Sequence, residues 1–309
     1  MRRATRAAIA VAAALLLLKA IGWWSSRSAA LFASLTDSSL DVLASGLNAW
    51  AIARAMAPAD REHRHGHGKL EALAALAQAV LITAAALTAA WQGWLAIREP
   101  QGIGPSGMAI AVMVVSLVAT VWLVRLQRQA AGATGSLAIA ADSLHYSGDI
   151  GQNAGVLIGI AASVWLDLAF VDGAVGLLVA LWIGRGAIAI GRSAVDQLLD
   201  SEADDETRAE VLRCLREQPG VRGVHDLRSR RSGPQLHATA HLAVDGEMTV
   251  KAAHELATAA EERLQAQFPG GHFVLHVDPD DLDREDPFGD DPAGGEPGRS
   301  TQGAGARPA

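Results

Sequence analysis

Six long apolar segments occupy most of the first two thirds of this 309-residue chain. A segment of about 20 mostly apolar residues is long enough to cross a lipid bilayer. The sequence therefore predicts a polytopic α-helical membrane protein. The expected spans cover residues 7–24, 30–56, 70–97, 108–124, 136–165 and 168–190.

The first apolar segment also allows a second interpretation, a cleaved signal peptide, because the basic stretch "MRRATR" precedes it. The apolar run continues past Lys19 to Trp24, and further apolar segments follow it. This length and context favour a first membrane span over a signal peptide.

The distribution of basic residues predicts the orientation of the spans. Arginine and lysine are frequent before the first span, between the second and third, after the fourth and at the end of the sixth. The opposite loops contain only Arg27 and Arg98. Since cytoplasmic loops carry the excess of positive charge, we expect both termini in the cytoplasm and a multi-pass protein of the inner (plasma) membrane.

The chain becomes more polar after Asp200. Segments with helical periodicity and segments with alternating polarity follow in the order α-β-β-α-β, which predicts a small α+β domain. From Pro279 onward the chain is rich in Asp, Gly and Pro and is expected to be disordered. We therefore predict three parts: a transmembrane domain at 1–200, a cytosolic α+β domain at 201–280, whose metal-binding role rests on the resemblance given below, and a disordered acidic tail at 281–309.

Composition excludes some classes of function. No basic block indicates a nucleic-acid partner, and the single cysteine, Cys214, allows neither an intramolecular disulfide nor a cysteine-based zinc motif. The spans show no nucleophile–base arrangement and no open zinc motif, so we expect no enzyme. The stretch beginning at His254, "HELAT", lacks the second histidine of a zinc-protease helix.

Ionisable residues inside the spans indicate a functional site. Asp37 and Asp41 lie four residues apart in the second span, and His145 and Asp149 have the same spacing in the fifth. Residues four apart share a helix face, and a charge in mid-membrane costs about 2.5 kcal/mol or more. One such pair alone is more often a polar contact between helices. Two pairs offer three carboxylates and one imidazole, which suit a tetrahedral divalent ion such as Zn²⁺.

Further histidines lie outside the spans. The loop "DREHRHGHGK" contains Asp60, His63, His65 and His67, a short histidine-rich tract that either binds metal or is a solvated basic loop. Dispersed histidines such as those of the polar domain are more often incidental. The polar domain contains His225, His241, His254, His276 and Asp278 on separate predicted elements.

Taken together, several motifs resemble the cation diffusion facilitator family, in its bacterial branch of zinc and ferrous-iron efflux proteins. They are "DSSLD" in the second span, "HGHGKLEALAALAQA" entering the third, "ADSLHYSGD" in the fifth, and "GVHDLRSRRSG" and "LHVDP" in the polar domain. The resemblance covers residues 7–279, and the acidic tail departs from the compact members of the family.

The resemblance implies a homodimer of six-helix subunits, each with a ferredoxin-like cytosolic domain similar to a metallochaperone. It assigns a transport site to Asp37, Asp41, His145 and Asp149, and a loop site to Asp60, His63 and His67. It assigns a cytosolic binuclear metal site to His225, His241, His254, His276 and Asp278. It also implies a charge pair between Lys69 and Asp200 at the membrane surface, and it leaves His65 without a role.

These features together predict a proton-coupled efflux transporter for zinc and related divalent cations. Metal would enter from the cytoplasm, bind near the middle of the bilayer and leave outward as inward-moving protons displace it. Two alternatives stay open: the same fold with ferrous iron, cadmium, cobalt or nickel as its main ion, and a membrane metal sensor that binds without transport. The expected partners are the lipid bilayer, protons and a second copy of the chain.

Overall fold

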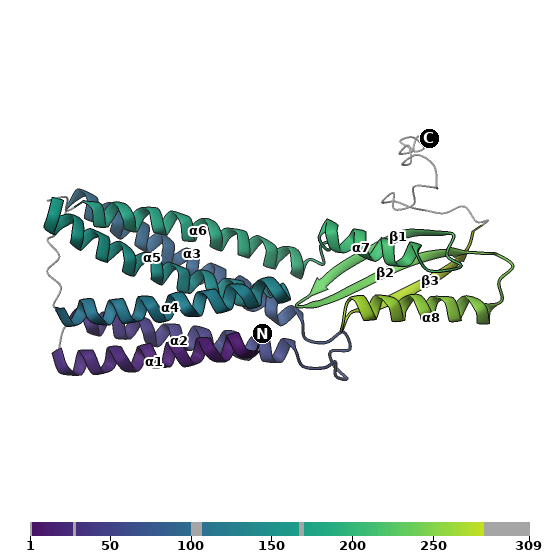
Figure 1. Cartoon of the computed structure of the whole chain (residues 1–309), viewed down its shortest axis with the longest axis horizontal. Helices are drawn as coiled ribbons and strands as arrows, with labels where there is room; N and C mark the ends of the chain where they lie inside the picture. Colours follow the sequence, from purple (N-terminus) through teal and green to yellow (C-terminus); the bar gives the residue numbers. More distant parts are fainter. Residues whose placement is uncertain (1, 27–28, 100–106, 167–169, 281–309) are drawn as a thin grey trace, which may run out of the picture. The chain divides into compact units, whose positions relative to one another are not determined.

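The computed structural model of the chain describes residues 2–26, 29–99, 107–166 and 170–280. The chain divides into two compact units, residues 1–199 and 200–309. The predicted tail at 281–309 lies outside the described residues. Figure 1 shows long helices in the first unit, and two shorter helices with a small sheet in the second.

The first unit consists of long helices that lie alongside one another (Figure 1). Within the described residues they are α1 (Arg2–Ser26), α2 (Ala29–Ala55), α3 (Lys69–Arg98), α4 (Gly107–Thr134), α5 (Leu137–Leu166) and α6 (Val171–Leu198). Four of them contain stretches that are long and apolar enough to cross a membrane: Arg3–Ile21, Lys69–Arg98, Ile110–Thr134 and Gly173–Leu198.

The prediction of six spans is therefore borne out for four helices by length and composition. The described residues of α2 and α5 do not include a stretch that meets the same length and hydropathy criteria. The physical reason lies in their polar residues: α2 contains Asp37 and Asp41, and α5 contains Asp142, His145 and Asp149.

Glycine allows α3 and α6 to approach each other closely. A Cβ atom built on Gly93 would lie 2.9 Å from the backbone oxygen of Gly173, and one built on Gly173 would lie 2.7 Å from the oxygen of Gly93. Both distances are shorter than any normal contact, so neither position tolerates a side chain without a shift of the helices. Close contact through small residues is the usual way in which helices associate in a bilayer.

The second unit contains α7 (Asp205–Arg216), β1 (Gly223–Ser232), β2 (Gln235–Val244), α8 (Val250–Gln267) and β3 (His272–Pro279), which is the predicted order. The strands form one sheet in the order β1-β2-β3, with β1 antiparallel and β3 parallel to β2. Gly233 and Pro234 form the turn that joins β1 to β2, and Gly233 adopts the positive φ of 60° that favours glycine there.

Apolar residues of both helices and all three strands form one core in the second unit. In β2 the buried side chains of Leu236, Ala238 and Ala240 alternate with more exposed ones, so one face of the sheet packs on the helices and the other stays open. A bulge in β1 between His225 and Arg228 changes this alternation. It allows Val224 and Leu227, three residues apart, to reach the same core.

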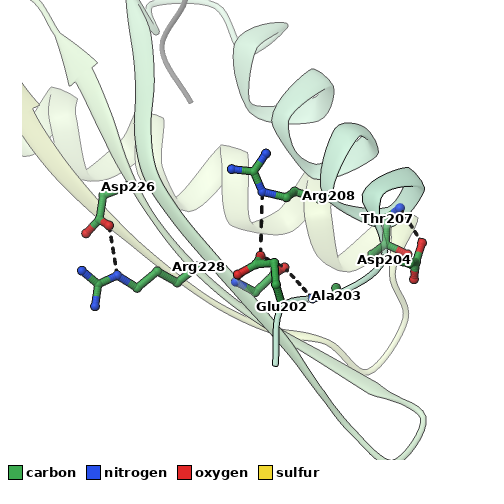
Figure 2. A network of polar contacts seen from close by, with 8 residues as sticks. Glu202, Ala203, Asp204, Thr207, Arg208, Asp226 and Arg228 are labelled. Carbon is green, nitrogen blue, oxygen red and sulfur yellow. Dashed lines mark hydrogen bonds and ion pairs between the residues drawn. The ribbon is translucent and has the colours of Figure 1, made fainter. Parts of the chain in front are cut away.

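The segment that leads into α7 is held by polar contacts, several of which Figure 2 shows. Glu202 accepts hydrogen bonds from the backbone N–H of Ser229, at 2.9 Å, and from its hydroxyl, and it lies 3.9 Å from Arg208. Asp204 caps α7 by accepting from the backbone N–H of Thr207 at 2.9 Å. Because Ser229 belongs to β1, these contacts fasten the start of the unit to its sheet.

The cap of α7 makes a measurable contribution to stability. The hydrogen bond from the Thr207 backbone, opposed in part by burial, lowers the pKa of Asp204. The Asp204 carboxylate therefore adds to the free energy of unfolding above its unfolded pKa of about 3.9. This stabilisation is lost as pH falls through the lower pKa of the folded state. We expect Asp204→Ala to cost about 1 kcal/mol at pH 7 and much less at pH 3.

Hydrogen exchange of the α7 backbone in the full chain in detergent, read by mass spectrometry and corrected for the intrinsic rate at each pH, measures this difference. Asp205→Ala is the matched control, because Asp205 is the next acid of the same helix end and does not cap it. An equal loss in the two variants at pH 7 would contradict the role of Asp204 as the cap.

Candidate metal centres

The first candidate centre lies between two helices of the first unit. Asp41 on α2 and His145 and Asp149 on α5 place one potential ligand atom each within 4.8 Å of one another. The imidazole Nε2 of His145 lies 2.9 Å from Oδ1 of Asp41, and both side chains are largely shielded from solvent. Asp37 lies one turn before Asp41 on the same helix, and its side chain is outside the described residues.

The arrangement follows from helix geometry. Residues 145 and 149 are four apart on α5, so they share a face, and that face meets α2 at Asp41. Two carboxylates and one imidazole supply oxygen and nitrogen ligands, both of which bind zinc in proteins. The described residues thus offer three of the four predicted ligands in one place.

A buried polar cluster lies one helical turn from this centre. The sequence did not show that its residues would come together. The carboxylate of Asp142 accepts hydrogen bonds from Gln78 of α3 at 3.1 Å, from Gln127 of α4 at 2.5 Å and from the hydroxyl of Ser45 of α2 at 3.4 Å. The same Ser45 hydroxyl bonds to the hydroxyl of Tyr146 at 2.8 Å.

These residues, Ser45, Gln78, Gln127, Asp142 and Tyr146, form what we call the Asp142 cluster, and all are buried. The cluster joins four helices, including the two that carry the candidate ligands. The signals in the sequence were one carboxylate, two carboxamides and two hydroxyls in or beside otherwise apolar spans.

The second candidate centre lies in the loop between α2 and α3. Asp60, His63 and His67 bring their ligand atoms within 4.8 Å of one another. Nδ1 of His63 and Nε2 of His67 lie 3.2 Å and 3.3 Å from the carboxylate of Asp60, and the two rings are 4.5 Å apart. Backbone N–H groups of Glu62 and His63 also bind Asp60, and the bond from His63 is the main reason why the pKa of Asp60 is lowered.

The third candidate centre crosses all three strands of the second unit. His225, His241 and His276 lie opposite one another on β1, β2 and β3, with ring centroids 5.3 Å and 4.8 Å apart. Asp278 binds all three: its carboxylate lies 3.3 Å, 2.7 Å and 3.0 Å from the nitrogens of His225, His241 and His276. The pairing of the three strands therefore brings four of the five predicted residues close together.

Electrostatics at this centre favours a charged carboxylate. Partial burial of Asp278 acts to raise its pKa, but the hydrogen bond from His241 and the neighbouring imidazoles outweigh it, and the pKa is lowered. A carboxylate that stays ionised beside imidazoles is ready to bind a cation. The fifth predicted residue, His254, lies exposed on α8 and is not part of the cluster that the described residues form.

The predicted charge pair involves residues of different units. The ammonium group of Lys69 donates to the carbonyl of Leu198 at the end of α6, at 3.2 Å. The carboxylate of Asp200 accepts from Arg230 of β1 at 3.1 Å. Because Lys69 belongs to the first unit and Asp200 to the second, their pairing stays a prediction.

Comparison with known proteins places both units in one family. Residues 5–199 match the model of the cation efflux transmembrane domain, and residues 203–280 match that of the cytoplasmic domain of cation efflux proteins. The chain is 39% identical to the cation-efflux pump FieF of Shewanella oneidensis over 276 residues, 89% of this chain and 93% of the relative. It is 38% identical to FieF of Serratia proteamaculans over 278 residues, 90% and 92% of the two chains.

A solved structure of CzrB, described as a zinc transporter in its zinc form, is 34% identical and covers 28% of this chain and 99% of its own, with a TM-score of 0.26. The two family matches together cover most of the chain, and the FieF relatives match over nearly their whole length. The prediction from the motifs is thus confirmed: the chain belongs to the cation diffusion facilitator family, the membrane transporters that carry out efflux of divalent metal cations.

Proposed function

We propose that this chain exports zinc and related divalent cations from the cytoplasm in exchange for protons. The observation that carries the proposal is the meeting of Asp41, His145 and Asp149 between α2 and α5. In the proposal Asp37 supplies the fourth ligand, and all six long helices of the first unit cross the inner membrane. The metal is the cargo of the site and not a resident cofactor.

Proton coupling would arise from the ligands themselves. An imidazole must be neutral to bind a metal, and its ordinary pKa of about 6.5 lies close to physiological pH. Protonation of His145 and of the carboxylates would release the metal on the acidic side. Because metal and protons compete for the same atoms, a change of access from one side to the other is enough to couple the two fluxes.

The remaining predicted residues receive supporting roles. Asp60, His63 and His67 would bind cytoplasmic metal near the entrance, and His225, His241, His276 and Asp278 would bind regulatory zinc in the domain at 201–280. That domain would associate with its copy in a homodimer, where His254 completes the metal site. The proposal keeps both termini in the cytoplasm, the division after residue 200 and the charge pair of Lys69 and Asp200.

Zinc uptake by proteoliposomes tests the proposal. With the purified chain in vesicles that are acidic inside, we expect zinc to accumulate as protons leave, and we expect an ionophore that collapses the pH gradient to suppress this accumulation. Zinc binding without uptake would favour the alternative of a metal sensor. A rate of zinc uptake that is the same with and without a pH gradient would contradict proton exchange. Inhibition of zinc uptake by ferrous iron, cadmium, cobalt and nickel measures how strongly each alternative ion competes for the transporter.

A further inference from the structure

Two more histidines face each other across the sheet of the second unit. His237 on β2 and His272 on β3 are register partners, four residues along each strand from the partners His241 and His276. Their ring centroids are 5.7 Å apart, and the ring planes are inclined by 31°. Neither residue belongs to the three candidate centres described above.

Both side chains lie on the open face of the sheet. Their strand neighbours Leu236, Ala238 and Phe273 point into the core that the helices cover. Because successive side chains of a strand point to opposite faces, His237 and His272 point away from that core. His272 is exposed and His237 is half-buried, with its Nε2 atom shielded from solvent, so an ion would approach the pair from the side of His272.

The spacing of the pair suits a shared metal ion. Imidazole nitrogens bind zinc at about 2.0–2.1 Å, and a tetrahedral angle at the metal then places two ring centroids about 5 Å apart. The separation of 5.7 Å is only slightly larger, and it is close to the 5.3 Å between His225 and His241 in the third centre. A shared ion would require rotations of the two side chains that bring one nitrogen of each onto it.

A positive charge on the neighbouring strand is partly neutralised. Arg230 lies opposite His237 on β1, and a cation close to the pair would weaken its affinity for metal. The guanidinium of Arg230, however, donates to the carboxylate of Asp200 at 3.1 Å, so the local charge is partly neutralised. This neighbour and the small number of ligands both predict a weaker site than the cluster around Asp278.

We propose that His237 and His272 form a second metal-binding site on this sheet, separate from the cluster around Asp278. With two imidazoles and water as the other ligands, it would take late first-row divalent ions such as Cu²⁺, Ni²⁺ and Zn²⁺ in preference to Mg²⁺ or Ca²⁺. Four residues of strand place it about 13 Å from the assigned cluster, too far for a shared ion. The site goes beyond the proposed transport function and does not depend on it.

Histidine footprinting of the full-length protein in detergent tests the site. Diethyl pyrocarbonate acylates the basic nitrogen of a neutral imidazole, and this is the nitrogen that a bound metal occupies. Mass spectrometry then reads each histidine separately. With zinc at about ten times the dissociation constant of the site, we expect acylation of His237 and His272 to fall about tenfold, as mass action requires.

Two variants separate chelation from simple shielding of the sheet face by a second subunit. In His272→Ala we expect zinc to protect His237 no longer, while His241 in the neighbouring cluster stays protected. Val274→Ala is the matched control: Val274 lies on the same strand and is exposed, and its replacement leaves the pair intact. Protection of His237 that persists in His272→Ala, or that is absent in the wild type, would overturn the proposal.

Discussion

Asp149→Ala is expected to lower zinc uptake by proteoliposomes more than about 100-fold, since loss of even an outer partner of a metal ligand costs about 10–100-fold in affinity or activity. Asp149 lies with Asp41 and His145 in the candidate transport site, and removal of its carboxylate leaves too few ligands to replace the hydration shell of the ion. The same loss is expected for Asp41→Ala.

The matched control for both variants is Asp196→Ala. Asp196 is an acid of the same unit, on α6, but its side chain is exposed and belongs to none of the candidate centres. Removal of this carboxylate should leave uptake close to the wild-type rate. Insertion and folding are checked by size-exclusion chromatography in detergent. Normal zinc uptake by correctly folded Asp149→Ala would exclude Asp149 as a ligand of the transported ion.

The second large effect is expected in the Asp142 cluster. Asp142→Leu would remove the acceptor for the carboxamide N–H groups of Gln78 and Gln127 and leave these donors buried. A buried polar group without its partner costs about 1–3 kcal/mol, so the two donors together cost about 2–6 kcal/mol. Because the cluster joins α2 and α5 one turn from Asp41 and His145, we also expect weaker zinc binding at that site.

Asp142→Asn is the matched control for the cluster. Its side chain has the same shape and keeps one acceptor oxygen, and the oxygen atoms of Gln78 and Gln127 can accept from its new N–H₂ group if either carboxamide turns over. We expect this variant to keep most of the thermal stability and zinc affinity that Asp142→Leu loses. The two quantities are measured by a melting curve in detergent and by zinc titration. A leucine variant as stable as the wild type would contradict the role of the cluster.

Much of the architecture could be predicted from patterns within single elements. Apolar segments of spanning length predicted the long helices, and the α-β-β-α-β order of the second unit followed from local periodicity. The i,i+4 spacing of His145 and Asp149 was enough to place them on one helix face. These properties depend on the period of the helix or strand, which the order of residues along the chain determines.

The partners across elements depended on the tertiary structure. Nothing in the spacing of Gln78 and Gln127 indicates that both bind Asp142, because that contact depends on how three separate helices pack. The bulge in β1 that places His225 opposite His241, and the position of His254 outside their cluster, are likewise properties of the packed sheet and helix.

For this protein, the sequence by itself determined the membrane class, the family and most of the candidate ligands. Each of these can be predicted from the composition, the residue spacing or the motifs of short segments. Only the tertiary structure decided which ligands meet, and it alone brought together the Asp142 cluster and the pair of His237 and His272. The physical reason is that contacts between distant residues depend on strand register and helix packing. These arise from the sum of many weak interactions over the whole chain and not from any short stretch of it.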